Sequence, residues 1–155
     1  MRQQVNRKLI FICALLLGIM VFEATWQVVS RYIFNAPSGW TDEILRFQLI
    51  WLTMIGAPLA HGMNRIMAVT VFVDRMNESK KRINKIVVEF IILIFAILVL
   101  VVGGFMVATN AYGQISASLG INMFYVYLSI PVSGFLFIFY NVLNLKEFIG
   151  KKEEK

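Results

Sequence analysis

Three polar residues in an otherwise apolar stretch are the first candidates for chemistry. Glu23, Gln27 and Ser30 stand at positions i, i+4 and i+7, which places them on one face of a helix. On such a face they can form hydrogen bonds to a neighbouring helix, or Glu23 can carry a proton across a membrane. The pattern favours hydrogen bonding between helices and leaves the proton carrier as an alternative.

A second group of charges begins the next apolar stretch, "WTDEILRFQLIW" at residues 40–51. Asp42 and Glu43 lie in the first turn of the expected helix, where the helix dipole favours negative charge. Arg46 follows Asp42 by four residues and Glu43 by three, so it can pair with either. Two interpretations stay open: capping with anchoring at the membrane surface, or burial of Arg46 and Trp51 against a partner protein.

The remaining reactive side chains predict neither catalysis nor a cofactor. Cys13 is the single cysteine, which excludes an internal disulfide and a thiolate metal site. His61 is the single histidine, and one imidazole cannot supply a pair of axial ligands to a membrane haem. The sequence holds no Ser/His/Asp arrangement, metal-binding cluster or glycine-rich phosphate loop. We therefore expect no enzymatic activity, no catalytic residues, and no metal or cofactor in this chain.

The elements that must position these residues are four apolar segments. The chain has 155 residues, 59% of them hydrophobic and 15% charged. The segments are 9–30, 40–60, 86–109 and 123–145, and at 1.5 Å per residue each exceeds a hydrocarbon core of about 30 Å. Backbone groups in lipid must be paired within the chain, so each segment predicts a helix. The predicted fold is an all-α integral membrane protein with four transmembrane helices in a single domain, 1–155.

The positions of lysine and arginine predict the orientation. Three lie before the first segment, one in 31–39, six in 61–85, none in 110–122 and four after 145. By the positive-inside rule, both termini and the connection 61–85 are cytoplasmic. Within that connection we expect a short interfacial helix in 66–83, followed by a lipid-phosphate patch. The patch consists of Lys80, Lys81, Arg82 and Lys85. Because the basic residues flank apolar segments, the net charge of +6 indicates phospholipid as a partner and no nucleic acid.

Small residues and one proline predict how the last two helices pack. Gly104 and Ala108 form a small-xxx-small step in the third segment, and Ser129 and Ser133 form another in the fourth. Such steps let helix backbones approach closely, within this chain or against a partner. Pro131 is expected to kink the fourth helix.

Two stretches resemble a known family. Residues 29–57, "VSRYIFNAPSGWTDEILRFQLIWLTMIGA", and residues 116–134, "SASLGINMFYVYLSIPVSG", are similar to the small membrane subunit (DctQ-type) of tripartite ATP-independent periplasmic (TRAP) transporters. One departure concerns His61, which stands earlier than the charged or histidine residue that such subunits often carry after the second helix. The resemblance implies partner-interface candidates, namely Arg31, Tyr32, Trp40, Glu43, Arg46, Trp51, Gly56 and Pro131.

The resemblance also implies a function, that of a scaffold subunit in the bacterial inner membrane. Its partners would be a large membrane subunit, which binds solute and couples it to sodium, and a periplasmic solute-binding protein. The imported solute would be an organic acid, with sialic acid preferred to a C4-dicarboxylate although no residue selects between them. Two alternatives remain open: an autonomous small proton-coupled antiporter that uses Glu23, and a membrane anchor of a redox complex.

Overall fold

The structure is a computed structural model, and it describes residues 2–35, 39–63 and 78–150. Its elements are α1 (Arg2–Tyr32), α2 (Gly39–Gly62), α4 (Glu78–Phe95), the π-helical η1 (Ala96–Gly103), α5 (Gly104–Asn110), α6 (Phe124–Tyr127) and α7 (Ser129–Gly150). Four stretches are long and apolar enough to cross a membrane: Arg2–Tyr32, Gly39–Gly62, Ile86–Asn110 and Phe124–Leu145. The predicted all-α fold with four spans is therefore confirmed.

Two helices begin earlier than hydropathy predicts. α1 begins at Arg2 and not at residue 9, and α4 begins at Glu78 and not at residue 86. Hydropathy marks the part of a helix that lies in lipid, whereas polar residues can continue the same backbone hydrogen bonds beyond it. Most of the interfacial helix expected in 66–83 lies outside the described residues, and residues 78–83 form the first turns of α4.

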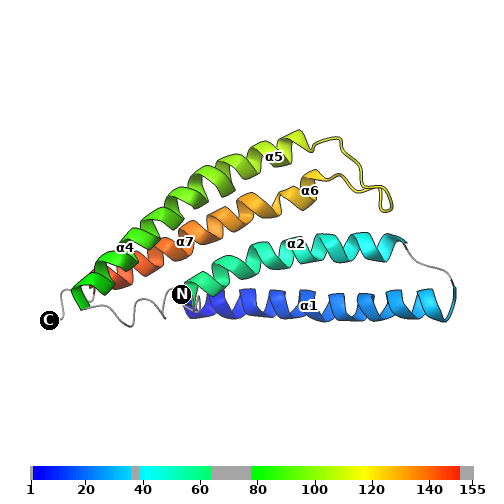
Figure 1. Cartoon of the computed structure of the whole chain (residues 1–155), viewed down its shortest axis with the longest axis horizontal. Coiled ribbons are helices and arrows are strands. Elements are labelled where there is room, and N and C mark those ends of the chain that lie inside the picture. The colour runs from blue at the N-terminus through cyan, green and yellow to red at the C-terminus, as the bar shows by residue number, and fades with distance from the viewer. Residues whose placement is uncertain (1, 36–38, 64–77, 151–155) are drawn as a thin grey trace.

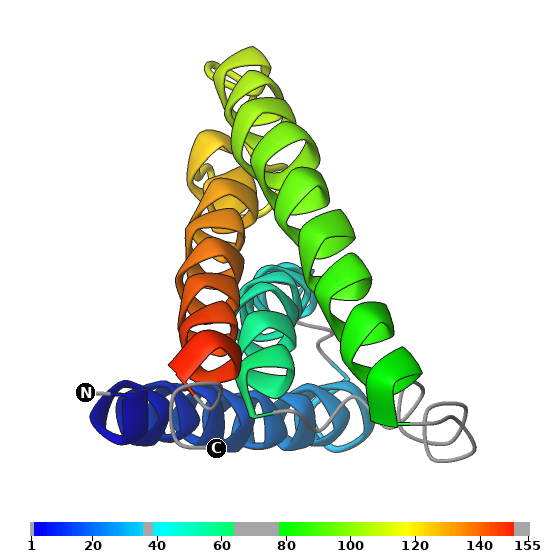
Figure 2. The same cartoon turned by 90° about the vertical axis from the view of Figure 1, so that its left-hand side faces the viewer.

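The four spans pack in the order α1, α2, α7 and the α4–η1–α5 helix. α2 contacts both α1 and α7, and α7 contacts η1 and α4. In both views α1 lies at the bottom and α5 at the top, with α2 and α7 between them (Figures 1 and 2). Following the predicted orientation, we call the end that carries the α1–α2 connection and the α5–α6 loop the outer end, and the opposite end the inner end. The third and fourth spans diverge from α1 and α2 toward the outer end (Figure 1).

Small residues bring the third and fourth spans together. A Cβ atom on Gly104 would lie 2.9 Å from Ile130 Cγ2 and 2.9 Å from Pro131 Cδ. Ala108, Ser129 and Ser133 are also buried. The predicted small-xxx-small steps thus lie at a seam within this chain, where the absence of large side chains permits close approach.

The fourth span is interrupted close to the predicted kink. α6 ends at Tyr127 and α7 begins at Ser129, with a turn at Leu128 between them. Pro131 has no N–H to donate to the Tyr127 carbonyl four residues earlier, so the ladder of helical hydrogen bonds is broken at this turn. The kink predicted from Pro131 therefore corresponds to a break one turn nearer the outer end.

Candidate functional site

The charged residues at the start of α2 are divided between two partners. Arg46 Nη2 lies 2.7 Å from Asp42 Oδ2, and the two side chains are 74% and 50% exposed. Glu43 Oε2 accepts hydrogen bonds from the backbone N–H groups of Ser118, at 2.9 Å, and Leu119, at 3.0 Å. Of the two partners that the sequence allowed for Arg46, the structure shows Asp42.

Glu43 thereby holds the loop between α5 and α6 against the outer end of α2. The loop reverses at Gly113 and Gly120, which have φ angles of +90° and +67°. An isolated antiparallel bridge joins Ile115 to Asn122. Because two adjacent N–H groups donate to one carboxylate oxygen, the loop conformation and the position of Glu43 depend on each other. The sequence offered Glu43 as a first-turn acid, as a partner for Arg46 and as an interface candidate. It did not indicate the contact with this loop, since the loop partners are backbone groups.

The polar stripe faces α2, as interhelical hydrogen bonding requires. Gln48 Nε2 donates to Glu23 Oε1 at 3.2 Å, and Gln27 Nε2 lies 3.4 Å from Asp42 Oδ1. Ser30 is buried, and its hydroxyl lies 3.4 Å from the Gln27 carbonyl. These contacts account for the stripe as a link between the first two spans.

The other partner-interface candidates differ in how far they are exposed on the surface of this chain. Tyr32 is 76% exposed, Trp40 is 47% exposed, and Arg31 is also exposed. Trp51 is half-buried, and a Cβ atom on Gly56 would meet nothing within 4 Å. Pro131, in contrast, is fully enclosed by this chain. Arg31, Tyr32 and Trp40 are thus available to a partner, whereas the side chain of Pro131 is used internally.

A second polar cluster, at the inner end, surrounds Glu89 of α4. Glu89 Oε2 lies 3.1 Å from His61 Nε2 and accepts from Asn141 Nδ2 at 2.7 Å, while Oε1 accepts from Asn144 Nδ2 at 2.9 Å. Asn141 Nδ2 also donates to the Glu89 backbone carbonyl at 2.7 Å. Glu89 and His61 are only 7% and 6% exposed, and both asparagines are buried. We call these four residues the Glu89 cluster.

The first span joins the Glu89 cluster through its N-terminal turns. Arg2 Nη2 donates to Asn144 Oδ1 at 3.0 Å and also to the Gly62 carbonyl. Tyr140 Oη donates to Asn6 Oδ1 at 2.6 Å. Side chains or backbone of all four spans therefore meet at the inner end.

Reasoning from the sequence missed the Glu89 cluster. His61 was left without a role, and no partner on another helix was predicted for it or for Glu89. The available signal was the presence of Glu89, Asn141 and Asn144 inside apolar segments, where polar groups require partners. The spacing within one helix cannot show which other helix provides those partners.

The described residues contain no group of three or more His, Cys, Asp or Glu that could hold a metal ion. The Glu89 cluster has one carboxylate and one imidazole, and its other donors are amides, which suits helix association through hydrogen bonds. The lipid-phosphate patch, Lys80, Lys81, Arg82 and Lys85, falls in the first turns of α4. The side chains of the patch lie outside the described part of the structure.

Comparisons with known proteins identify the family of the chain. Residues 19–150 match the family described as tripartite ATP-independent periplasmic transporters, DctQ component. A Haemophilus influenzae chain assigned as a TRAP transporter small permease protein is 33% identical over 62% of this chain and 60% of its own length. The sialic acid TRAP transporter small permease protein SiaQ of Vibrio cholerae is 25% identical over 80% of this chain and 71% of its own length.

A longer relative is also similar. The isethionate TRAP transporter permease protein DctMQ of Oleidesulfovibrio alaskensis is 30% identical over 79% of this chain, but the match covers only 20% of that protein. The chain thus spans about 60% of the first relative and a fifth of the third. The match to the family covers most of the 155 residues and includes both the polar stripe and the Glu89 cluster. The chain belongs to the family of DctQ components of TRAP transporters.

Proposed function

We propose that this chain is the static scaffold subunit of a sodium-coupled, binding-protein-dependent transporter that imports an organic acid. As a TRAP small permease subunit it works with a large membrane subunit. In the proposal the large subunit carries the solute and sodium sites, and a periplasmic solute-binding protein delivers the solute. The small subunit widens the fixed frame against which the large subunit moves.

The observation that carries this proposal is the exposure of α1. No residue in the most apolar window of α1 is buried by the rest of the chain. The outer part of α2 also presents Trp40 and Arg46 to the surroundings. A charged side chain exposed within a transmembrane helix favours a protein partner over lipid alone. The partner-interface candidates at this end, from Arg31 to Arg46, together with Trp51 and Gly56 further along α2, are proposed to contact the large subunit.

The orientation, the lipid contact and the substrate class belong to the same proposal. The distribution of lysine and arginine supports cytoplasmic termini in the bacterial inner membrane, with Lys80, Lys81, Arg82 and Lys85 against phospholipid headgroups. One relative is named for sialic acid and another for isethionate, both of which are organic acids. We propose sialic acid or a C4-dicarboxylate as the solute, selected by the other two proteins.

Co-expression with the large subunit tests the function. We expect the two membrane chains to co-purify and, after reconstitution into vesicles, to take up the solute when the binding protein and an inward sodium gradient are supplied. Vesicles that contain the small subunit alone should show no uptake. Proton-coupled transport by the small subunit alone, lost in Glu23→Gln, would instead support the antiporter alternative.

A further inference from the structure

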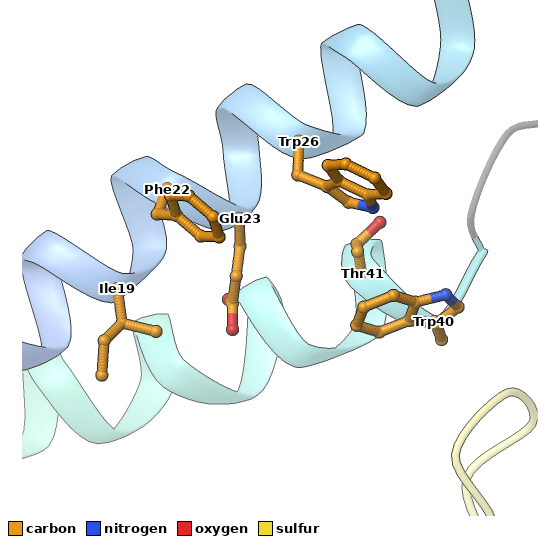
Figure 3. Close-up of a pocket in the computed structure, with 6 residues that line it drawn as sticks. All are labelled: Ile19, Phe22, Glu23, Trp26, Trp40 and Thr41. Carbon is orange, nitrogen blue, oxygen red and sulfur yellow. The ribbon is translucent and has the colours of Figure 1, made fainter. Parts of the chain in front are cut away.

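A pocket of about 440 Å³ opens between the outer halves of α1 and α2. It is lined by Ile19, Phe22, Glu23, Trp26, Trp40 and Thr41. Figure 3 shows the Glu23 side chain extended from α1 toward α2, with Trp26 and Trp40 on the side nearer the α1–α2 connection. Because the Phe22 side chain at its wall is 74% exposed, the pocket opens to the surroundings of the chain.

The Glu23 carboxylate in this pocket is incompletely paired. Oε1 accepts one hydrogen bond of 3.2 Å, from the neutral amide of Gln48. Oε2 is buried and has no hydrogen-bond partner in the described part of the chain. Arg46 is the one arginine of α2, which has no lysine, and its guanidinium is already paired with the Asp42 carboxylate at 2.7 Å. A carboxylate removed from water is stabilised by a positively charged donor, so the pocket favours a cation from outside the chain.

The depth of Glu23 distinguishes a lipid headgroup from a protein side chain as the source of that cation. The apolar segment 9–30 is centred between Ile19 and Met20. At 1.5 Å per residue Glu23 lies about 5 Å from that centre, and therefore about 10 Å inside the edge of a 30 Å hydrocarbon core. A lipid ammonium group resides outside the core, whereas a lysine or arginine on a neighbouring helix can approach laterally at this depth.

We propose that this pocket receives a lysine or arginine side chain from a transmembrane helix of the large subunit, which forms an ion pair with Glu23. The inference rests on the proposed function, because that function supplies the partner. The faces of Phe22, Trp26 and Trp40 suit a cation, since aromatic rings attract positive charge. Ile19 offers apolar surface to the aliphatic part of the incoming side chain. An unpaired basic residue in lipid is costly, so each charge compensates the other.

Site-specific photo-crosslinking tests the occupant in the assembled complex. Benzoylphenylalanine replaces Phe22 at the pocket wall or, as a control, Phe90, which is 60% exposed on the third span. We expect the probe at position 22 to capture a large-subunit peptide with a lysine or arginine at membrane depth, and the probe at position 90 not to capture that peptide. Capture of phospholipid alone, or of a peptide without a basic residue, would overturn the proposal.

Charge exchange then tests the ion pair. Glu23→Leu should reduce the amount of co-purified large subunit by roughly tenfold or more, because the buried basic side chain of the partner would lose its counter-charge. The matched control is Thr25→Leu, since the Thr25 hydroxyl donates to the Val21 carbonyl of its own helix and the side chain is exposed. Glu23→Lys combined with an acidic substitution of the mapped basic residue should restore the complex.

The outcomes separate this inference from the proposed function. If the parent chain and Glu23→Leu bring down equal amounts of the large subunit, the ion pair is refuted while the scaffold role stands. If the parent chain brings down none, the scaffold role fails, and the inference fails with it.

Discussion

Replacing Glu89 is the most informative test of how the four spans are held together. Its carboxylate oxygens accept from Asn141 and Asn144 of α7, and Oε2 lies 3.1 Å from His61 Nε2 of α2. Glu89→Ala removes all three side-chain contacts. Asn141 keeps its hydrogen bond of 2.7 Å to the Glu89 backbone carbonyl, so His61 and Asn144 lose the most.

The size of the effect follows from the number of stranded donors. Measured interhelical hydrogen bonds in membrane proteins average about 0.6 kcal/mol, so three contribute about 2 kcal/mol. A buried donor left without an acceptor costs about 1–3 kcal/mol, so two fully stranded donors raise the upper figure to about 6 kcal/mol. For a chain of this length, 1 kcal/mol corresponds to a change in Tm of about 2–4 °C. We therefore expect Glu89→Ala to lower the Tm by about 4 °C at the least and by up to about 24 °C.

The assay is thermal unfolding of the detergent-solubilised chain, followed by the loss of its monodisperse peak. The control is Phe90→Ala at the adjacent exposed position, where truncation leaves no polar group unpaired. A double-mutant cycle with Asn144→Ala should show clear non-additivity, because either variant alone breaks the same 2.9 Å contact. Equal Tm values for the parent and Glu89→Ala, or strict additivity in the cycle, would refute a role for Glu89 in holding the spans together.

Three further predictions address the seam, the orientation and the outer charges. Gly134→Ala should lower the free energy of unfolding by about 1–3 kcal/mol, because the new Cβ would lie 2.8 Å from Val101 Cγ2. Gly56→Ala is the control, since a Cβ there would meet nothing within 4 Å. Equal Tm values for the two variants would contradict this prediction. In a cysteine-free background, Ala117→Cys should react with an impermeant thiol reagent outside intact cells and Ser79→Cys should not; the reverse labelling would invert the topology. Arg46→Ala should change the Tm of the isolated chain little, since an exposed pair contributes about 0–1 kcal/mol. Arg46→Ala should nevertheless lower solute uptake by the reconstituted complex if Arg46 contacts the large subunit. Unchanged uptake would mean that Arg46 serves only to anchor α2 at the membrane surface.

The sequence predicted the number and type of the elements well, because the physical signal for both is local. An apolar stretch longer than the hydrocarbon core must be a helix, and α2 spans Gly39–Gly62 where 40–60 was expected. The start of α4 was missed because helix formation in 78–85 needs no apolar residues. The break at Leu128 could be placed only to within a turn, since Pro131 removes a hydrogen bond whose acceptor lies four residues earlier.

The candidate site was predictable only where its contacts are local. The pair of Asp42 and Arg46 follows from their i, i+4 spacing within one helix. The contact of Glu43 with Ser118 joins positions 75 residues apart, and that of Glu89 with Asn144 joins positions 55 apart. Which polar residue meets which across helices depends on rotation and crossing of the helices, and neither is encoded in the spacing along one of them.

The polar contacts hold α2, α4, α7 and the α5–α6 loop together more firmly than they hold the outer half of α1. Glu89 ties α4 to α2 and α7 at the inner end, and Glu43 ties α2 to the α5–α6 loop at the outer end. The seam of small residues sets the distance between the third and fourth spans but offers few directional contacts. The two carboxylates therefore determine how the helices are aligned along their axes.

The outer half of α1, by contrast, is held to α2 by polar contacts of 3.2 and 3.4 Å, through Glu23 and Gln27. The first of these contacts lies at the upper limit of the usual N–H···O distance and the second exceeds it, so together they constrain a helix less than the shorter contacts of the inner cluster do. If a partner's basic side chain enters the pocket, Glu23 gains the charged donor that its own chain does not supply. We therefore expect association with the large subunit to fix the outer half of α1 while leaving the Glu89 cluster unchanged. Hydrogen exchange on the free and assembled chain would show this as added protection near Glu23 and at the proposed contacts on α2, with none around Glu89.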